Sequence, residues 1–119
     1  MSELASLFVW RRGEVVVAAL TGELDVSNAA ALEREIVLEV GNDAAGLVLD
    51  LAGLAFMDSS GVHLLFHLAE RLAVRGRRLA AIAPIGGPAR RVLELTGPEP
   101  RRWIHDDEDA ALAAVLDEP

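Results

Sequence analysis

The feature that most constrains the fold is an apolar segment followed, after a short polar break, by a helical pattern. Leu47-Val48-Leu49-Asp50-Leu51 is apolar on both faces, as is typical of a central strand. From Val62 to Leu72 the apolar residues recur at spacings of three and four, which predicts an amphipathic helix. A strand leading directly into a helix predicts a β–α unit of an α/β fold.

The rest of the chain adds similar units. Two short strands, 8–12 and 15–20, flank the turn Arg12-Gly13-Glu14 and predict a hairpin, and Thr21-Gly22-Glu23 is expected to end the second strand. The later elements are expected to be a helix at 29–40, strand 47–51, helix 62–73, strand 78–83, helix 89–95, a brief strand at 103–104 and a last helix from 106 to 116. This alternation implies parallel pairing with right-handed crossovers.

Size and apolar content predict one globular domain over residues 1–119. The chain has 119 residues, and 52% of them are hydrophobic. A chain of this length buries about two-thirds of its unfolded surface, which is enough for a core. No apolar run approaches the roughly 20 residues that span a bilayer, so membrane insertion is not expected. The start Met1-Ser2-Glu3-Leu4 lacks the basic region of a secretory signal, so we expect a cytoplasmic protein.

Charge and residue types argue against several functions. The net charge of −8 disfavours nucleic-acid binding, and the absence of cysteine excludes disulfides and thiolate chemistry. All eleven basic residues are arginine, so the chain has no lysine for a P-loop. His63 and His67 lie one helical turn apart without a third ligand, so neither a metal nor another cofactor is expected. The arginine pairs at 90–91 and 101–102 suit either anion recognition or a solvated helix face.

The polar break itself, Met57-Asp58-Ser59-Ser60-Gly61, places two hydroxyls at the start of the helix. A helix N-terminus has unpaired N–H groups and about half a positive elementary charge, so it tolerates a phosphate. A phosphorylated serine carries roughly −1.5 to −2 charges. Asp58 and the serines also suit helix capping. The motif therefore predicts a cap, a phosphorylation switch, or both.

Four segments in order resemble the STAS domain of anti-sigma factor antagonists. The segments are Leu20-Thr21-Gly22-Glu23-Leu24-Asp25, the strand 47–51, the motif Phe56-Met57-Asp58-Ser59-Ser60-Gly61-Val62, and the stretch from Pro88 to Gly97. The resemblance extends over about residues 7–116. It implies a single STAS domain of the α/β class, with a small mixed sheet of about four or five strands and helices packed on one side.

The resemblance also implies a function by partner switching, without catalysis by this chain. The unphosphorylated protein is expected to bind an anti-sigma factor that is also a serine kinase, and so to free the sigma factor. Phosphorylation then releases the complex, and a phosphatase resets it. The implied acceptor is Ser59, with Ser60 as the second candidate. Asp25, Asp58, Ser60, Gly61 and Val62 are expected to form the surroundings of the switch and the partner-binding surface.

Other interpretations remain open from the sequence. Asp25 also suits a turn after a strand. Val62 stands where leucine is commoner in the family, and Trp103 where a smaller or phenyl side chain is usual. A STAS accessory subunit or scaffold of a transporter or signalling complex would use the serine only as a contact. A small hydrolase or transferase using Asp25, Asp58 and Ser59 is disfavoured because no histidine or metal cluster is placed to activate the serine.

Overall fold

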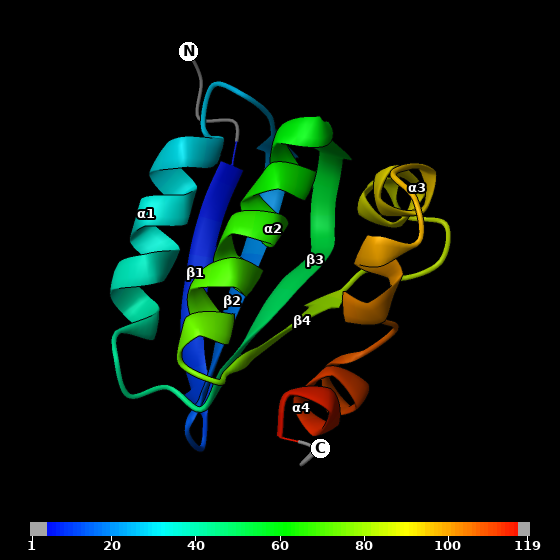
Figure 1. The fold of residues 1–119 in the computed structure, drawn as a ribbon. Helices are drawn as coiled ribbons and strands as arrows, with labels where there is room; N and C mark the ends of the chain where they lie inside the picture. Colours follow the sequence, from blue (N-terminus) through cyan, green and yellow to red (C-terminus); the bar gives the residue numbers. More distant parts are fainter. Residues whose placement is uncertain (1–4, 117–119) are drawn as a thin grey trace.

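A five-stranded sheet forms the centre of the computed structural model, which describes residues 5–116 (Figure 1). The strands are hydrogen-bonded in chain order: β1 (Ala5–Arg12), β2 (Val15–Leu24), β3 (Gly46–Met57), β4 (Arg78–Ile82) and β5 (Ile104–His105). β1 and β2 are antiparallel, and each later pair is parallel. The four α-helices within residues 5–116 are α1 (Ala29–Val40), α2 (Ser59–Val74), α3 (Pro88–Leu95) and α4 (Glu108–Leu116). The expected α/β class with a small mixed sheet is confirmed.

Residues 1–4 and 117–119 lie outside the described residues. The two ends of the expected domain fall there, as do the N-terminal residues on which the cytoplasmic expectation depends. Between residues 5 and 116, none of the helices has both the length and the apolar character needed to cross a membrane.

The two central strands are longer than the sequence pattern predicted. β2 does not end at Thr21-Gly22-Glu23 but continues to Leu24, and β3 continues past Leu51 to Met57. The register between the two strands shifts twice in this part, so β3 contains extra residues relative to β2. The buried residues of β3 are consequently spaced by three here, at 51, 54 and 57. A strand with this irregularity lacks the alternation by which strands are predicted from sequence.

The helices cover both faces of the sheet, which corrects the expectation that all of them lie on one side. Val16 and Leu20 of β2 belong to the larger core cluster with α1 and α2. Val15 and Val17 point to the opposite face, where they form a second cluster with Ala111 and other residues of α4. Neighbouring residues of a strand face opposite sides, and β2 is apolar on both, so both faces need a cover.

The helix α3 lies beside the second half of β3. β4 pairs only with residues 46–50 of β3, so the rest of β3 has no strand on that side. α3 lies beside β3 there (Figure 1). Its Ala89 and Leu93 are buried in the larger cluster. A helix in this position protects an open strand edge. The 3-10 helix Glu99–Trp103 follows, and Trp103 packs against Phe66 of α2 edge to face with ring centroids 4.9 Å apart.

Candidate functional site

The motif predicted to be a switch lies where β3 ends and α2 begins. A single residue, Asp58, separates the two elements, and it is the N-cap of α2. Its carboxylate accepts a hydrogen bond from the backbone N–H of Ser60 at 2.8 Å. The capping role expected of this motif therefore belongs to Asp58, and Ser59 is left as the first residue of the helix.

Ser59 is exposed, and its hydroxyl makes no hydrogen bond with any residue between 5 and 116. Ser60 is half-buried. α2 has 16 residues, so the partial positive charge of a full helix N-terminus acts at Ser59. Of the two serines, Ser59 has the more accessible hydroxyl.

The next two residues of the motif hold the helix start onto the sheet. Gly61 and Val62 are both buried. A Cβ atom at Gly61 would lie 2.5 Å from Met57 Cγ and 2.6 Å from Met57 Sδ, closer than real contacts allow. The absence of a side chain at Gly61 therefore lets the first turn of α2 approach the last residue of β3. This close approach positions Ser59 relative to the strand ends.

Asp25 follows the neighbouring strand and lies at the same level as Asp58. Leu24 is opposite Met57 in the parallel register, and the N–H of Asp58 donates to the carbonyl of Leu24 at 3.3 Å. Because these two strands end together, the structure brings the Asp25 loop beside the start of α2. The predicted neighbours Asp25, Asp58 and Ser59 thus share one edge of the sheet.

The Asp25 carboxylate is held within its own loop. It accepts hydrogen bonds from the Ser27 N–H at 2.9 Å and from the Ser27 hydroxyl at 2.6 Å. Asn28 completes the loop: its amide oxygen accepts from the Asp25 N–H, and its amide nitrogen donates to the Glu23 carbonyl at 2.9 Å. These bonds make Asp25 a turn residue, as one interpretation of the sequence held, and hold its carboxylate within the loop between β2 and α1.

Sequence reasoning missed the apolar side chains beside this edge. Val26, next to Asp25, is 81% exposed, and Phe56, three residues before Ser59, is 46% exposed. Apolar side chains left in water beside polar groups are common in protein-binding surfaces. The available signal was an apolar residue inside a polar loop, Asp25-Val26-Ser27.

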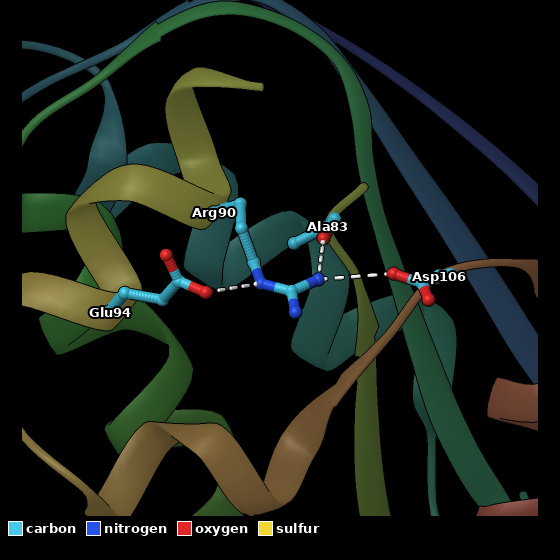
Figure 2. A network of polar contacts seen from close by, with 4 residues as sticks. All are labelled: Ala83, Arg90, Glu94 and Asp106. Carbon is cyan, nitrogen blue, oxygen red and sulfur yellow. Dashed lines mark hydrogen bonds and ion pairs between the residues drawn. The ribbon is translucent and has the colours of Figure 1, made fainter. Parts of the chain in front are cut away.

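One arginine of each pair, Arg90 and Arg102, is engaged in the fold, whereas Arg91 and Arg101 are exposed. Figure 2 shows Arg90 donating from Nη1 to the Ala83 carbonyl at 2.9 Å and to Asp106 at 3.1 Å, and from Nε to Glu94 at 2.9 Å. The hydrogen bond to Glu94, helped by Asp106, raises the pKa of Arg90 above its usual value, while desolvation opposes this. Arg90 therefore links α3 to the end of β4 and to the segment before α4. Arg102 lies over the Trp103 ring, 5.6 Å from its centroid.

The two histidines of α2 lie on its surface. His67 Nδ1 is 3.1 Å from Glu33 Oε1 of α1, and His63 is exposed. Within residues 5–116 there is no group of three or more histidine and acidic side chains arranged to hold a metal ion.

A hairpin opening a mostly parallel sheet, with the serine motif at the central strand-to-helix junction, defines a distinct class of small α/β domain. The sequence profile of the STAS domain matches residues 9–111. The chain therefore belongs to the STAS domain family, as the sequence resemblance implied.

Two of the similar proteins are mycobacterial anti-sigma factor antagonists. The anti-sigma-F factor antagonist RsfB of Mycobacterium tuberculosis is 32% identical over 83 residues, which make up 70% of this chain and 66% of RsfB. The crystal structure of an anti-sigma factor antagonist from Mycobacterium paratuberculosis matches with a TM-score of 0.82, 31% identity and 95% coverage of both chains.

The anti-sigma factor antagonist SpoIIAA has the same fold. Its unphosphorylated form matches with a TM-score of 0.74 and 26% identity, over 92% of this chain and 96% of SpoIIAA. Its phosphorylated form, from Bacillus, matches with a TM-score of 0.66. These relatives support the interpretation of the chain as an anti-sigma factor antagonist.

Proposed function

We propose that this chain acts as a single STAS domain that binds an anti-sigma factor with serine kinase activity, and that phosphorylation of Ser59 releases it. The observation that carries the proposal is the exposed, unbonded hydroxyl of Ser59 at the first position of α2, beside Asp25 and Asp58. The relatives add support because they are antagonists of anti-sigma factors. One of them, SpoIIAA, is known in a phosphorylated form.

A phosphate at Ser59 is compatible with the fold of this domain but disfavours the complex with a partner. The N-terminal end of α2 attracts negative charge, so the phosphorylated domain stays folded. Asp25 and Asp58 already make this edge acidic, and a phosphate adds roughly −1.5 to −2 charges. A partner fitted to a neutral hydroxyl then has to desolvate or repel that charge. Such a mismatch costs several kcal/mol, or about a hundredfold or more in affinity.

The docking surface comprises the start of α2, the Asp25 loop and the exposed side chain of Val26. The polar groups provide selectivity for the unphosphorylated state. Val26, which is 81% exposed in the free chain, provides apolar contact area. The substitution Val26→Asp is expected to weaken partner binding without changing the phosphoacceptor.

In this proposal the chemistry belongs to the partner. The carboxylate of Asp58 caps α2 and that of Asp25 binds Ser27, so neither is hydrogen-bonded to Ser59 as a general base. The kinase supplies Mg–ATP and the base. The Ser59 oxygen bonds to the γ-phosphorus, its proton passes to the base, and ADP leaves. A phosphatase later hydrolyses the ester with water. The need for ATP places the exchange in the cytoplasm.

The test uses the full chain with the anti-sigma factor kinase of its native host, identified by pull-down. Affinity is measured by calorimetry for the wild type, Ser59→Asp and Ser59→Ala. We expect Ser59→Asp to bind at least about tenfold more weakly, since it carries one charge instead of nearly two. Ser59→Ala is expected to bind normally and to take up no phosphate from Mg–ATP. The matched control is Ser60→Ala, which should accept phosphate at residue 59.

Two results would contradict the proposal. Phosphopeptide mapping that places the phosphate only on Ser60 refutes the choice of acceptor. The second result is a partner that binds the wild type and Ser59→Asp equally tightly and transfers no phosphate to the chain. That result indicates a STAS accessory subunit or scaffold instead. Turnover of a small substrate that is lost in Ser59→Ala would point to an enzyme.

A further inference from the structure

A cavity of about 440 Å³ lies between the C-terminal halves of α1 and α2, away from the serine motif. Leu47, near the start of β3, lines it, whereas Ser59 follows the end of that strand. Leu47 and Met57 are ten positions apart along β3, a distance of roughly 30 Å. The cavity is therefore independent of the proposed switch. Its volume lies in the range of about 300–1,000 Å³ that is usual for small-molecule sites.

The inner part of the cavity is apolar. Five of its lining residues are buried hydrophobic side chains of α1, α2, β3 and the segment between α1 and β3: Val40, Ala44, Leu47, Leu68 and Leu72. Two further lining residues, Leu38 and Val74, are 81% and 86% exposed and stand at the mouth. The walls thus continue as apolar surface into the solvent, which suits a ligand with an apolar chain.

The charged groups of the cavity are all positive. Arg71, Arg75 and Arg77 line it, and none of its described lining residues is Asp or Glu, although the chain carries 19 acidic residues and a net charge of −8. Arg75 donates to Asn42 Oδ1 at 2.5 Å, which holds it across the segment that follows α1. Arg71 and Arg77 make no side-chain hydrogen bond or ion pair with any residue from 5 to 116.

Helix capping accounts for only part of this arrangement. Arginines near a helix C-terminus interact favourably with the helix dipole, and Arg71 lies in the last turn of α2. Capping does not explain Arg77, which lies beyond the helix, or the apolar hollow that the three arginines surround. Guanidinium groups beside an apolar cavity match a ligand that has an oxyanion head and an apolar tail.

We propose that this cavity binds a small amphipathic anion, with its single alkyl chain inside and its carboxylate or phosphate monoester on Arg71 and Arg77. Each methylene buried strengthens binding by up to about fourfold. Each charge-assisted arginine contact contributes about tenfold or more. Binding requires neither Ser59 nor a protein partner, so its failure leaves the proposed switch untouched.

The experiment is calorimetric titration of the full chain with dodecanoate and with dodecyl phosphate, both kept below micelle-forming concentrations. We expect calorimetry to give one molecule bound per chain. In NMR spectra of the same titration, we expect chemical shift changes at the methyl groups of Val40, Leu68 and Leu72. Dodecanol tests the tail without the charge, and butyrate tests the charge with a short tail. Both are expected to bind at least about tenfold more weakly than dodecanoate.

The matched variants differ only in which two arginines are removed. Arg71→Gln with Arg77→Gln is expected to weaken dodecanoate binding at least about tenfold. Arg91→Gln with Arg101→Gln changes the net charge equally, at two exposed arginines outside the cavity, and is expected to bind like wild type. Thermal unfolding of both double variants checks that the fold is retained.

Several outcomes would overturn the proposal. It is wrong if both arginine pairs weaken binding equally, or if dodecanol binds as well as dodecanoate. It is also wrong if neither dissolved amphiphile binds. The last measurement uses vesicles containing phosphatidylglycerol. If the chain binds these vesicles but not dissolved dodecyl phosphate, the ligand is a membrane surface. If a double variant unfolds, the comparison of dodecanoate, dodecanol and butyrate on the wild type still decides.

Discussion

The close approach of Gly61 to Met57 can be tested by adding a single methyl group. In Gly61→Ala, the new Cβ would lie 2.5 Å from Met57 Cγ, 2.6 Å from Met57 Sδ and 3.1 Å from Leu24 Cδ2. Favourable carbon contacts are about 3.5–4.0 Å, so Met57 and the helix start must separate by about 1 Å. Met57 is only 2% exposed and cannot swing into solvent.

Two opposing effects decide the size of the change. Overpacking a core in this way costs about 1–3 kcal/mol. Alanine gains up to about 1 kcal/mol over glycine in a helix, because it restricts the unfolded chain. We therefore expect Gly61→Ala to lower the free energy of unfolding by about 1 kcal/mol. The strain is relieved most easily by a tilt of the first turn of α2, which also displaces Ser59.

A double-mutant cycle in urea, followed by circular dichroism, separates the two effects. Met57→Ala alone costs about 2–5 kcal/mol because it leaves a cavity, but it also removes the atoms that clash with the new methyl group. In that background Gly61→Ala should become stabilising, by up to about 1 kcal/mol. A coupling energy of about 1–3 kcal/mol is the expected signature. If Gly61→Ala stabilises the protein equally with and without Met57, the reasoning is refuted.

Three further predictions concern other parts of the structure and use the same denaturation assay. Asp58→Ala removes the cap on the Ser60 N–H and should cost about 0.5–2 kcal/mol, whereas Asp58→Asn should retain most of it; equal losses would contradict the capping role. Arg90→Leu leaves a buried carbonyl unpaired and should cost about 1–3 kcal/mol, while the exposed control Arg91→Leu should stay within about 0.5 kcal/mol. Trp10→Phe removes a buried indole N–H that has no hydrogen-bond partner among residues 5–116, and the relieved desolvation of about 1–3 kcal/mol opposes the loss of ring packing against the second cluster. The two effects should leave stability within about 1 kcal/mol of wild type, and a loss above about 3 kcal/mol would contradict this.

Much of the fold was predictable from local patterns. The periodicity of residues 62–72 predicted α2, and Arg12-Gly13-Glu14 predicted the hairpin, in which Gly13 adopts φ 63°. Pro88 was expected in the first turn of a helix and is found there. Periodicity, caps and turns depend on residues close together in the chain, so the sequence carries them directly.

Within the site, the sequence also identified the motif and its two possible roles. It could not decide between Asp58 and the serines as the cap, because all of these residue types suit that position. The structure assigns the cap to Asp58 and leaves Ser59 exposed. It also shows that Asp25 lies beside the motif through the pairing of Leu24 with Met57, a contact between residues 33 positions apart.

The sequence by itself determined the family, the order of helices and strands, and the identity of the candidate phosphoacceptor. Only the tertiary structure decided the length of β2 and β3, the placement of α4 on the second face of the sheet, and the arginine-lined cavity between α1 and α2. The physical reason is that strand pairing, burial and cavities arise from contacts between segments distant in the chain, which local preference does not specify.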